Sequence, residues 1–117
     1  MKEAFEWHKI ANTPEELHFS CEGLASVCIG DRKLCIAFLQ NKFFACSALC
    51  PHAGGQLAAG FTDSAGNIIC SVHCYKFSLT TGRNVSGEGY LLKTFPVETR
   101  VGGIYVGIKK EQEKLVP

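Results

Sequence analysis

Residues 50–57 read CPHAGGQL and residues 70–83 read CSVHCYKFSLTTGR, and these two stretches decide the fold of this chain. Each begins with a cysteine and has a histidine two or three residues later: Cys50 with His52, and Cys70 with His73. Seventeen residues, 53–69, separate the two pairs. Two thiols and two imidazoles are soft or borderline donors, and together they are enough to close one metal site. In a Cys2His2 zinc finger both cysteines precede both histidines, whereas here each half holds one of each.

The two pairs and their spacing resemble the Rieske 2Fe–2S signature, which is C-x-H, a spacer of this length, then C-x-x-H. The similarity continues to Phe77 and Thr81-Gly82, which resemble the family's F…TG run. The ending FPVETRVGGIYVGI, residues 95–108, resembles the family's last hairpin. The resemblance therefore covers roughly residues 5–108, nearly the whole chain.

The resemblance implies one Rieske-type 2Fe–2S cluster as cofactor, held by Cys50, His52, Cys70 and His73. In such a centre two thiolates bind one iron and two imidazoles bind the other. Replacing two thiolates by neutral imidazoles removes two negative charges, so the cluster accepts an electron more readily than an all-cysteine cluster does. Imidazole also has a second nitrogen that can face solvent. We therefore expect the cysteines to be the inner ligands and the histidines to be the exit for the electron.

Two departures distinguish the chain from high-potential members of the family. Those members join the two cluster loops by a disulfide, whose cysteines would fall at Gly55 and Val72. They also place hydroxyl donors to the cluster sulfurs at positions matching Tyr75 and Phe77. Phe77 has no hydroxyl, and the phenol of Tyr75 is longer than the serine usual there. Fewer hydrogen bonds to sulfur stabilise the reduced cluster less, so the pattern resembles the soluble, low-potential Rieske ferredoxins that feed aromatic-ring dioxygenases.

Short apolar segments rich in β-branched and aromatic residues predict an all-β fold. They lie at residues 5–11, 24–29, 33–39, 43–46, 67–72, 90–95 and 104–108. Short strands separated by glycine turns are typical of a sandwich or barrel. The resemblance implies a single Rieske domain, 1–117, with a Rieske-like antiparallel β-sandwich or barrel as its base. A small cluster-binding subdomain would be inserted in this base at about residues 47–86.

Length, charge and cysteine content exclude several classes of protein. A chain of 117 residues fits one domain, and its net charge of +1 gives no reason to expect a nucleic acid or an anionic membrane as partner. No stretch approaches the about 20 apolar residues of a membrane-spanning helix. Seven cysteines without an export signal indicate a reducing compartment rather than disulfides. We therefore expect a cytoplasmic protein without a membrane anchor.

The remaining cysteines have structural interpretations. Four of them lie in or beside apolar segments, where free cysteine behaves as a small buried hydrophobe, and we expect core positions for Cys21, Cys28, Cys35 and Cys46. Cys74 directly follows His73, where the related ferredoxins often have glycine-containing residues. We interpret Cys74 as a small side chain under the loop, rather than as a spare ligand or a redox-active thiol.

These features favour a soluble one-electron carrier that passes electrons between a reductase and an oxygenase-type acceptor. The chain has no G-x-G-x-x-G fingerprint for a nicotinamide or flavin, and it lacks room for a mononuclear-iron domain, so we expect no catalysis by the chain alone. One alternative is a Rieske small subunit or regulatory module of a larger oxidoreductase complex. Another is a structural zinc module using the same four donors, which would be colourless.

Overall fold

The computed structural model describes residues 4–52 and 54–109, and most of its regular structure is β-strand. The strands are β1 (Phe5–Ala11), β2 (Leu24–Ile29), β3 (Arg32–Leu39), β4 (Lys42–Ser47), β5 (Phe61–Thr62), β6 (Asn67–Ile69), β7 (Lys76–Ser78), β8 (Thr94–Phe95), β9 (Val97–Arg100) and β10 (Gly103–Lys109). Two 3₁₀ helices, η1 (Pro14–Leu17) and η2 (Leu57–Ala59), interrupt them. The strands pair antiparallel in three sheets, ordered β1-β10-β9, β2-β3-β4-β8 and β5-β6-β7. The all-β prediction is confirmed.

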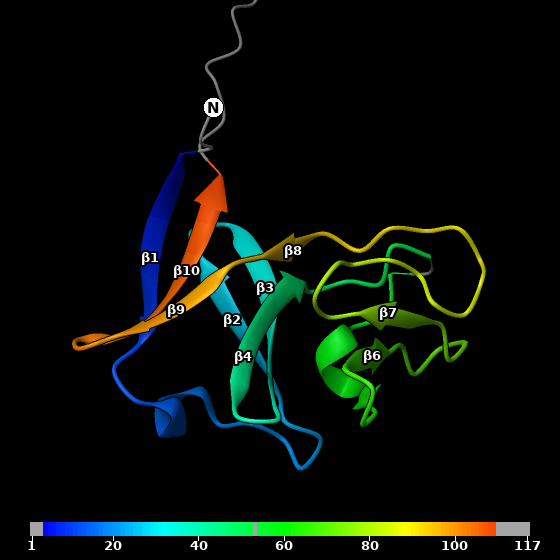
Figure 1. The fold of residues 1–117 in the computed structure, drawn as a ribbon, viewed down its shortest axis with the longest axis horizontal. Helices are drawn as coiled ribbons and strands as arrows, with labels where there is room; N and C mark the ends of the chain where they lie inside the picture. The colour runs from blue at the N-terminus through cyan, green and yellow to red at the C-terminus, as the bar shows by residue number, and fades with distance from the viewer. Residues whose placement is uncertain (1–3, 53, 110–117) are drawn as a thin grey trace, which may run out of the picture.

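The first two sheets form a β-base with a common core, at the left of Figure 1. Leu34 and Ile36 of β3 and Ile104 and Val106 of β10 are at most 1% exposed and belong to the same hydrophobic cluster. Successive side chains of a strand point to opposite faces, so these alternate residues line one side of each sheet. Burying a side chain of this size stabilises the folded state by about 1.5–3 kcal/mol relative to exposing it. This shared core therefore holds the two sheets of the base together.

The middle of strand β3, residues 34–37, is buried on both faces, which explains the uninterrupted apolar sequence there. Leu34 and Ile36 face the core of the base, whereas Cys35 and Ala37 belong to a second hydrophobic cluster. All four residues are 0% exposed. The second cluster also contains Cys50 and residues of the small sheet, so β3 lies between the base and the candidate site.

The cysteines of the base divide into two kinds. Cys35 and Cys46 are buried and directly opposite each other on β3 and β4, as expected for core residues. Contact with the Cys35 thiol, together with burial, raises the pKa of Cys46, which therefore stays protonated. For Cys21 and Cys28 the core prediction is wrong, because both are exposed. Cys21 lies in a turn, and Cys28 lies near the end of the edge strand β2, opposite the exposed Lys33 of β3.

The small sheet β5-β6-β7 lies beside the base, at the right of Figure 1, and its strands fall between β4 and β8 in the chain. The predicted strand at 67–72 ends at Ile69, because the chain turns through residues 70–75. The predicted strand at 90–95 is reduced to β8. Strands β5 and β7 were not among the predicted apolar segments, since each is only two or three residues long. The subdomain boundaries at 47 and 86 stay a prediction.

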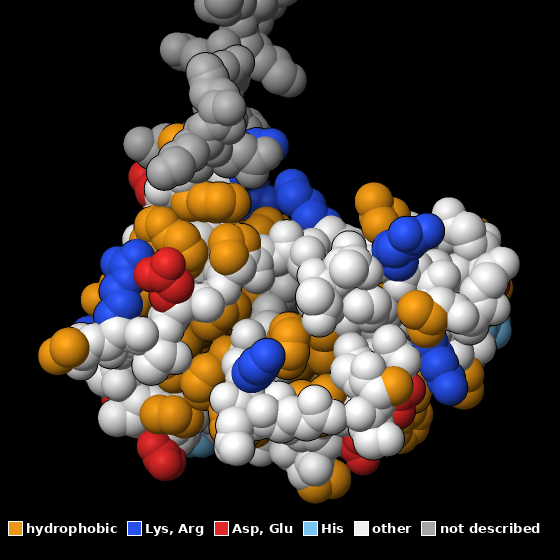
Figure 2. Space-filling view, in the orientation of Figure 1, with side chains coloured by type: hydrophobic (Ala, Val, Ile, Leu, Met, Phe, Trp, Pro, Cys, Tyr) orange, Lys and Arg blue, Asp and Glu red, His pale blue; other side chains and the backbone are white. Residues whose placement is uncertain are grey.

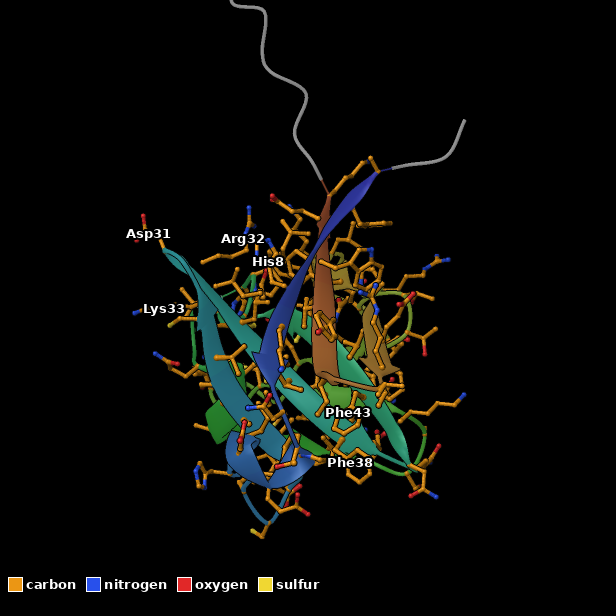
Figure 3. The ribbon with its side chains drawn as sticks, turned by 90° about the vertical axis from the view of Figure 1, so that its left-hand side faces the viewer. His8, Asp31, Arg32, Lys33, Phe38 and Phe43 are labelled. Atoms are coloured by element: carbon orange, nitrogen blue, oxygen red, sulfur yellow. The ribbon has the colours of Figure 1, made fainter. Side chains whose placement is uncertain are left out.

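The surface of the base carries charges of both signs and, at the turn between β3 and β4, a pair of phenylalanines. Figure 2 shows basic and acidic side chains scattered over one face rather than gathered by sign, in keeping with a net charge of +1. Phe38 and Phe43 lie side by side at the turn between β3 and β4, with ring centroids 4.7 Å apart (Figure 3).

Within the described residues, none of the helices is both long and apolar enough to cross a membrane.

Candidate metal centre

The two Cys/His stretches form two loops with the same backbone hydrogen bonds. In the first, the Cys50 carbonyl accepts from Gly54 N–H at 2.9 Å, and Cys50 N–H donates to the Gly55 carbonyl at 2.8 Å. In the second, the Cys70 carbonyl accepts from Cys74 N–H at 2.8 Å, and Cys70 N–H donates to the carbonyl of residue 75 at 3.0 Å. Each loop thus folds back on its own cysteine and closes with two bonds to that residue, which places the cysteine at the base of the loop.

The matching positions Gly54 and Cys74 both have a left-handed backbone, with φ of 72° and 60°. Glycine adopts this conformation freely, whereas a residue with a Cβ is strained there. The second loop therefore keeps the shape of the first although it has cysteine where glycine would be unstrained. Cys74 is exposed, so it is not packed under the loop as we predicted from the sequence.

Replacing Cys74 by glycine is expected to stabilise the protein, by about 1 kcal/mol, because it removes the left-handed strain. The visible spectrum should not change, since we do not propose Cys74 as a ligand. Thermal unfolding of the metal-loaded protein measures the first effect, and Cys28→Gly on the exposed part of β2 is the control, which should destabilise. A bleached Cys74→Gly variant would instead support the spare-ligand interpretation.

The four predicted donors come together, and they do so as two pairs. Cys50 and Cys70 are 2% and 1% exposed, and their side chains are in hydrogen-bonding contact. His52 is half-buried and His73 exposed, with their Nδ1 atoms 3.4 Å apart and their ring centroids 4.8 Å apart. The thiols thus lie inside and the imidazoles lie at the surface, as the sequence led us to expect.

The spacing of the imidazoles fits two ligands of one ion. Two nitrogens bound at about 2.0–2.1 Å, the distance known for zinc and imidazole, lie about 3.4 Å apart when the ion is tetrahedral. In the part of the chain that the structure describes, however, no three His, Cys, Asp or Glu side chains are placed to hold one metal ion. A pair of thiols and a separate pair of imidazoles suits a centre with two irons better than the single ion of a zinc module.

The Rieske [2Fe-2S] domain family model matches residues 6–96. The chain belongs to this family. Its cofactor is accordingly a Rieske 2Fe–2S cluster, and the donor set fits that cofactor. Burial, with the neighbouring Cys50 thiol, raises the pKa of Cys70, so that a thiolate at this place needs a compensating positive charge. Ferric iron supplies such a charge, and coordination deprotonates a thiol.

Two relatives in the family are ferredoxin components of oxygenase systems. The ferredoxin component of the alkene monooxygenase system of Xanthobacter autotrophicus is 25% identical over 68% of this chain and 65% of its own length. The ferredoxin subunit of 3-phenylpropionate/cinnamic acid dioxygenase of Photorhabdus laumondii is 31% identical over 62% of this chain and 70% of its own. The matched part of this chain thus spans slightly under two thirds of the first relative.

A solved structure also resembles the chain over most of its length. It is described as the complex of reduced oxygenase and oxidized ferredoxin in carbazole 1,9a-dioxygenase. The matched chain has a TM-score of 0.74 and 26% identity, and the match covers 92% of this chain and 97% of that one. The Rieske-type base with its small third sheet is therefore the fold of this protein.

The two loops approach each other closely at Gly55. A Cβ built there would lie 2.6 Å from Cγ2 of Val72, 3.1 Å from the Cys70 sulfur and 3.7 Å from the Cβ of Val72. The shortest of these distances explains why this position takes glycine opposite a valine, since a Cβ would force Val72 to shift. The Cβ–Cβ distance lies within the about 3.5–4.5 Å found in a disulfide, so Gly55 and Val72 face each other where high-potential relatives would have their disulfide.

Two tyrosines beside the histidines were not predicted as part of the site. The ring of Tyr75 lies 4.2 Å from that of His52, and the ring of Tyr90 lies 5.3 Å from it, between centroids. Burial, followed by the nearby Glu88 carboxylate, raises the pKa of Tyr75, so its phenol is neutral at physiological pH. Tyr90 lies outside both motifs, and only its position in the fold brings it to the site.

Proposed function

We propose that this protein is a one-electron carrier whose cluster is held by Cys50 and Cys70 at one iron and by His52 and His73 at the other. The observation that carries the proposal is the division of the donors into a buried thiol pair and an outer imidazole pair. When bound, the cluster takes up and returns a single electron. The electron donor would be a reductase and the acceptor an oxygenase of the kind that the relatives' ferredoxin components serve.

The residues of the chain divide the work of such a carrier. Cys50 and Cys70 hold the buried side, where the second hydrophobic cluster, which includes Phe77 and Leu57, excludes water. His73, with its exposed ring, lies at the surface that a partner can approach. Transfer of an electron requires only a short distance between the cluster and the redox centre of the partner. A carrier of this kind therefore needs neither a substrate pocket nor a catalytic residue of its own.

The test uses the metal-loaded protein with the purified reductase and oxygenase of a related aromatic-ring dioxygenase system. We expect NADH and the reductase to bleach the visible absorption with one electron per chain, and the oxidised oxygenase to restore it. His73→Ala should abolish both steps, whereas replacing the distant and half-buried His8 should leave them intact. Reduction that occurs only inside a stable complex purified from the native source would contradict a free carrier and favour the subunit alternative.

A cytoplasmic location follows as a further part of the proposal. None of the seven cysteines, all within the described residues, forms a disulfide, although Cys35 and Cys46 lie directly opposite each other. Thiols in such contact persist where glutathione and thioredoxin keep the compartment reducing. Fractionation of cells that express the native chain tests this, and recovery in an exported fraction would contradict it.

A further inference from the structure

The two imidazoles of the site have unequal surroundings. His52 is half-buried and has two tyrosine rings within 5.3 Å, those of Tyr75 and Tyr90. His73 is exposed, and its ring lies 6.0 Å from that of Tyr75. The two tyrosines are also neighbours, stacked at 29° with centroids 6.1 Å apart. They therefore form one continuous aromatic surface, and it lies over His52 more than over His73.

The loop that carries Tyr90 is fastened to strand β7. The Asn84 side-chain amide donates to the Lys76 carbonyl at 3.0 Å and to Glu88 Oε1 at 2.9 Å. Its Oδ1 accepts from the backbone N–H groups of Glu88 and of Gly89, the latter at 2.7 Å. Asn84 thus ties the loop to β7 on one side and fixes the residues just before Tyr90 on the other.

The aromatic surface has a second anchor at Tyr75, which belongs to the second loop. Its carbonyl accepts the closing bond from Cys70 N–H, and strand β7 begins at the next residue. Both rings are therefore mounted on backbone that is held by hydrogen bonds. Aromatic rings packed at these distances attract each other beyond the area they bury, so a fixed ring restrains the imidazole against it.

We propose that Tyr75 and Tyr90 are positioning residues that cover His52, hold its imidazole in the liganding orientation and keep solvent away from it. The inference rests on the proposed ligation by His52 and concerns its stability, which the proposed function does not specify. With His52 covered, His73 is the imidazole that faces solvent. The two tyrosine rings, which we call the cover, should therefore slow the release of iron on the side of His52. The number of electrons that the cluster takes up should not change.

The test compares the rate of cluster loss in variants of the metal-loaded protein. The visible absorption is followed in the presence of a ferrous-iron chelator, and the EPR spectrum of each reduced variant is recorded. Tyr90→Ala should shorten the half-life of the cluster about two- to tenfold, the range expected for loss of the ring contact with His52, and should broaden the spread of g values. Tyr90→Phe keeps the ring and should match the unmodified protein in both measurements.

Two control variants distinguish the loss of the tyrosine cover from a general destabilisation of the loop or of the protein. Leu91→Ala removes a 68% exposed apolar side chain from the same loop, and Tyr105→Ala removes the remaining tyrosine, which lies on β10 of the base. Neither should change the half-life or the g values. Equal half-lives for Tyr90→Ala and the unmodified protein, or the same loss in Leu91→Ala, would overturn the cover. An unmodified protein without a Rieske EPR spectrum would instead overturn the ligation itself.

Discussion

Serine in place of Cys50 or Cys70 is expected to abolish binding of the 2Fe–2S cluster, so that the purified variant is colourless. The two side chains are 2% and 1% exposed and in contact with each other, so no water or distant side chain can take the place of a missing thiolate. A serine hydroxyl is a harder donor than a thiol and does not ionise near neutral pH. Cys74, four residues after Cys70, is exposed, and we do not propose it as a ligand. Iron and sulfide analysis with the visible spectrum measures the loss.

Other cysteines provide matched controls for this result. Cys28→Ser changes an exposed residue and should leave colour and stability unchanged. Cys46→Ser places a hydroxyl at a 0% exposed position, so it should keep the colour and cost about 1–3 kcal/mol of stability if the hydroxyl has no partner. Full iron and sulfide content in Cys50→Ser would contradict our assignment of that ligand.

The reduction potential is expected at the low end of the Rieske range, about −150 mV. Phe77 is 0% exposed in the same hydrophobic cluster as Cys50 and Cys70, and it offers no hydroxyl to their sulfurs. Gly55 and Val72 face each other and cannot form a disulfide. Without the hydroxyl, fewer hydrogen bonds to sulfur stabilise the more negative reduced cluster less, and the missing disulfide is a second departure from the high-potential members of the family. Protein-film voltammetry measures it, and a midpoint well above 0 mV would contradict this reasoning.

Adding one hydroxyl to the hydrophobic cluster around Cys50 and Cys70 tests whether missing hydrogen bonds to sulfur keep the potential low. Phe77→Tyr should raise the potential, because its phenol is added beside the core that contains both cysteines. Phe95→Tyr is the control, since Phe95 is also buried but belongs to the core of the base. A rise in both variants would show that the change is not specific to the cluster side.

The sequence predicted the long strands and the four side chains that the fold brings together, because both are encoded in local patterns. Strand β2 was predicted with its observed bounds, and β3 to within one residue, because their apolar patterns and turns are local signals. The Cys/His pairs carry their chemistry in their spacing. In contrast, β6 ends early because the loop after Ile69 closes on Cys70, and Cys28 is exposed because it lies opposite the exposed Lys33, where that face of the sheet is left open. Both outcomes depend on tertiary neighbours.

The aromatic part of the site was hidden from sequence reasoning for the same reason. Tyr90 is 38 residues after His52, at the start of a segment that we predicted to be a strand, and the loop held by the hydrogen bonds of Asn84 brings its ring to His52 instead. The one available signal was Tyr75, which stands where the related pattern has a serine. In the fold its larger ring packs against that of His52.

EPR spectroscopy of the reduced protein is the most direct test of whether the four donors hold one Rieske cluster. Iron, sulfide and zinc are measured in the same sample. We predict about two irons and two acid-labile sulfides per chain and the low average g value of mixed cysteine and histidine ligation. Stoichiometric zinc without sulfide, in a colourless and EPR-silent protein, would contradict the binding of an iron-sulfur cluster by these donors.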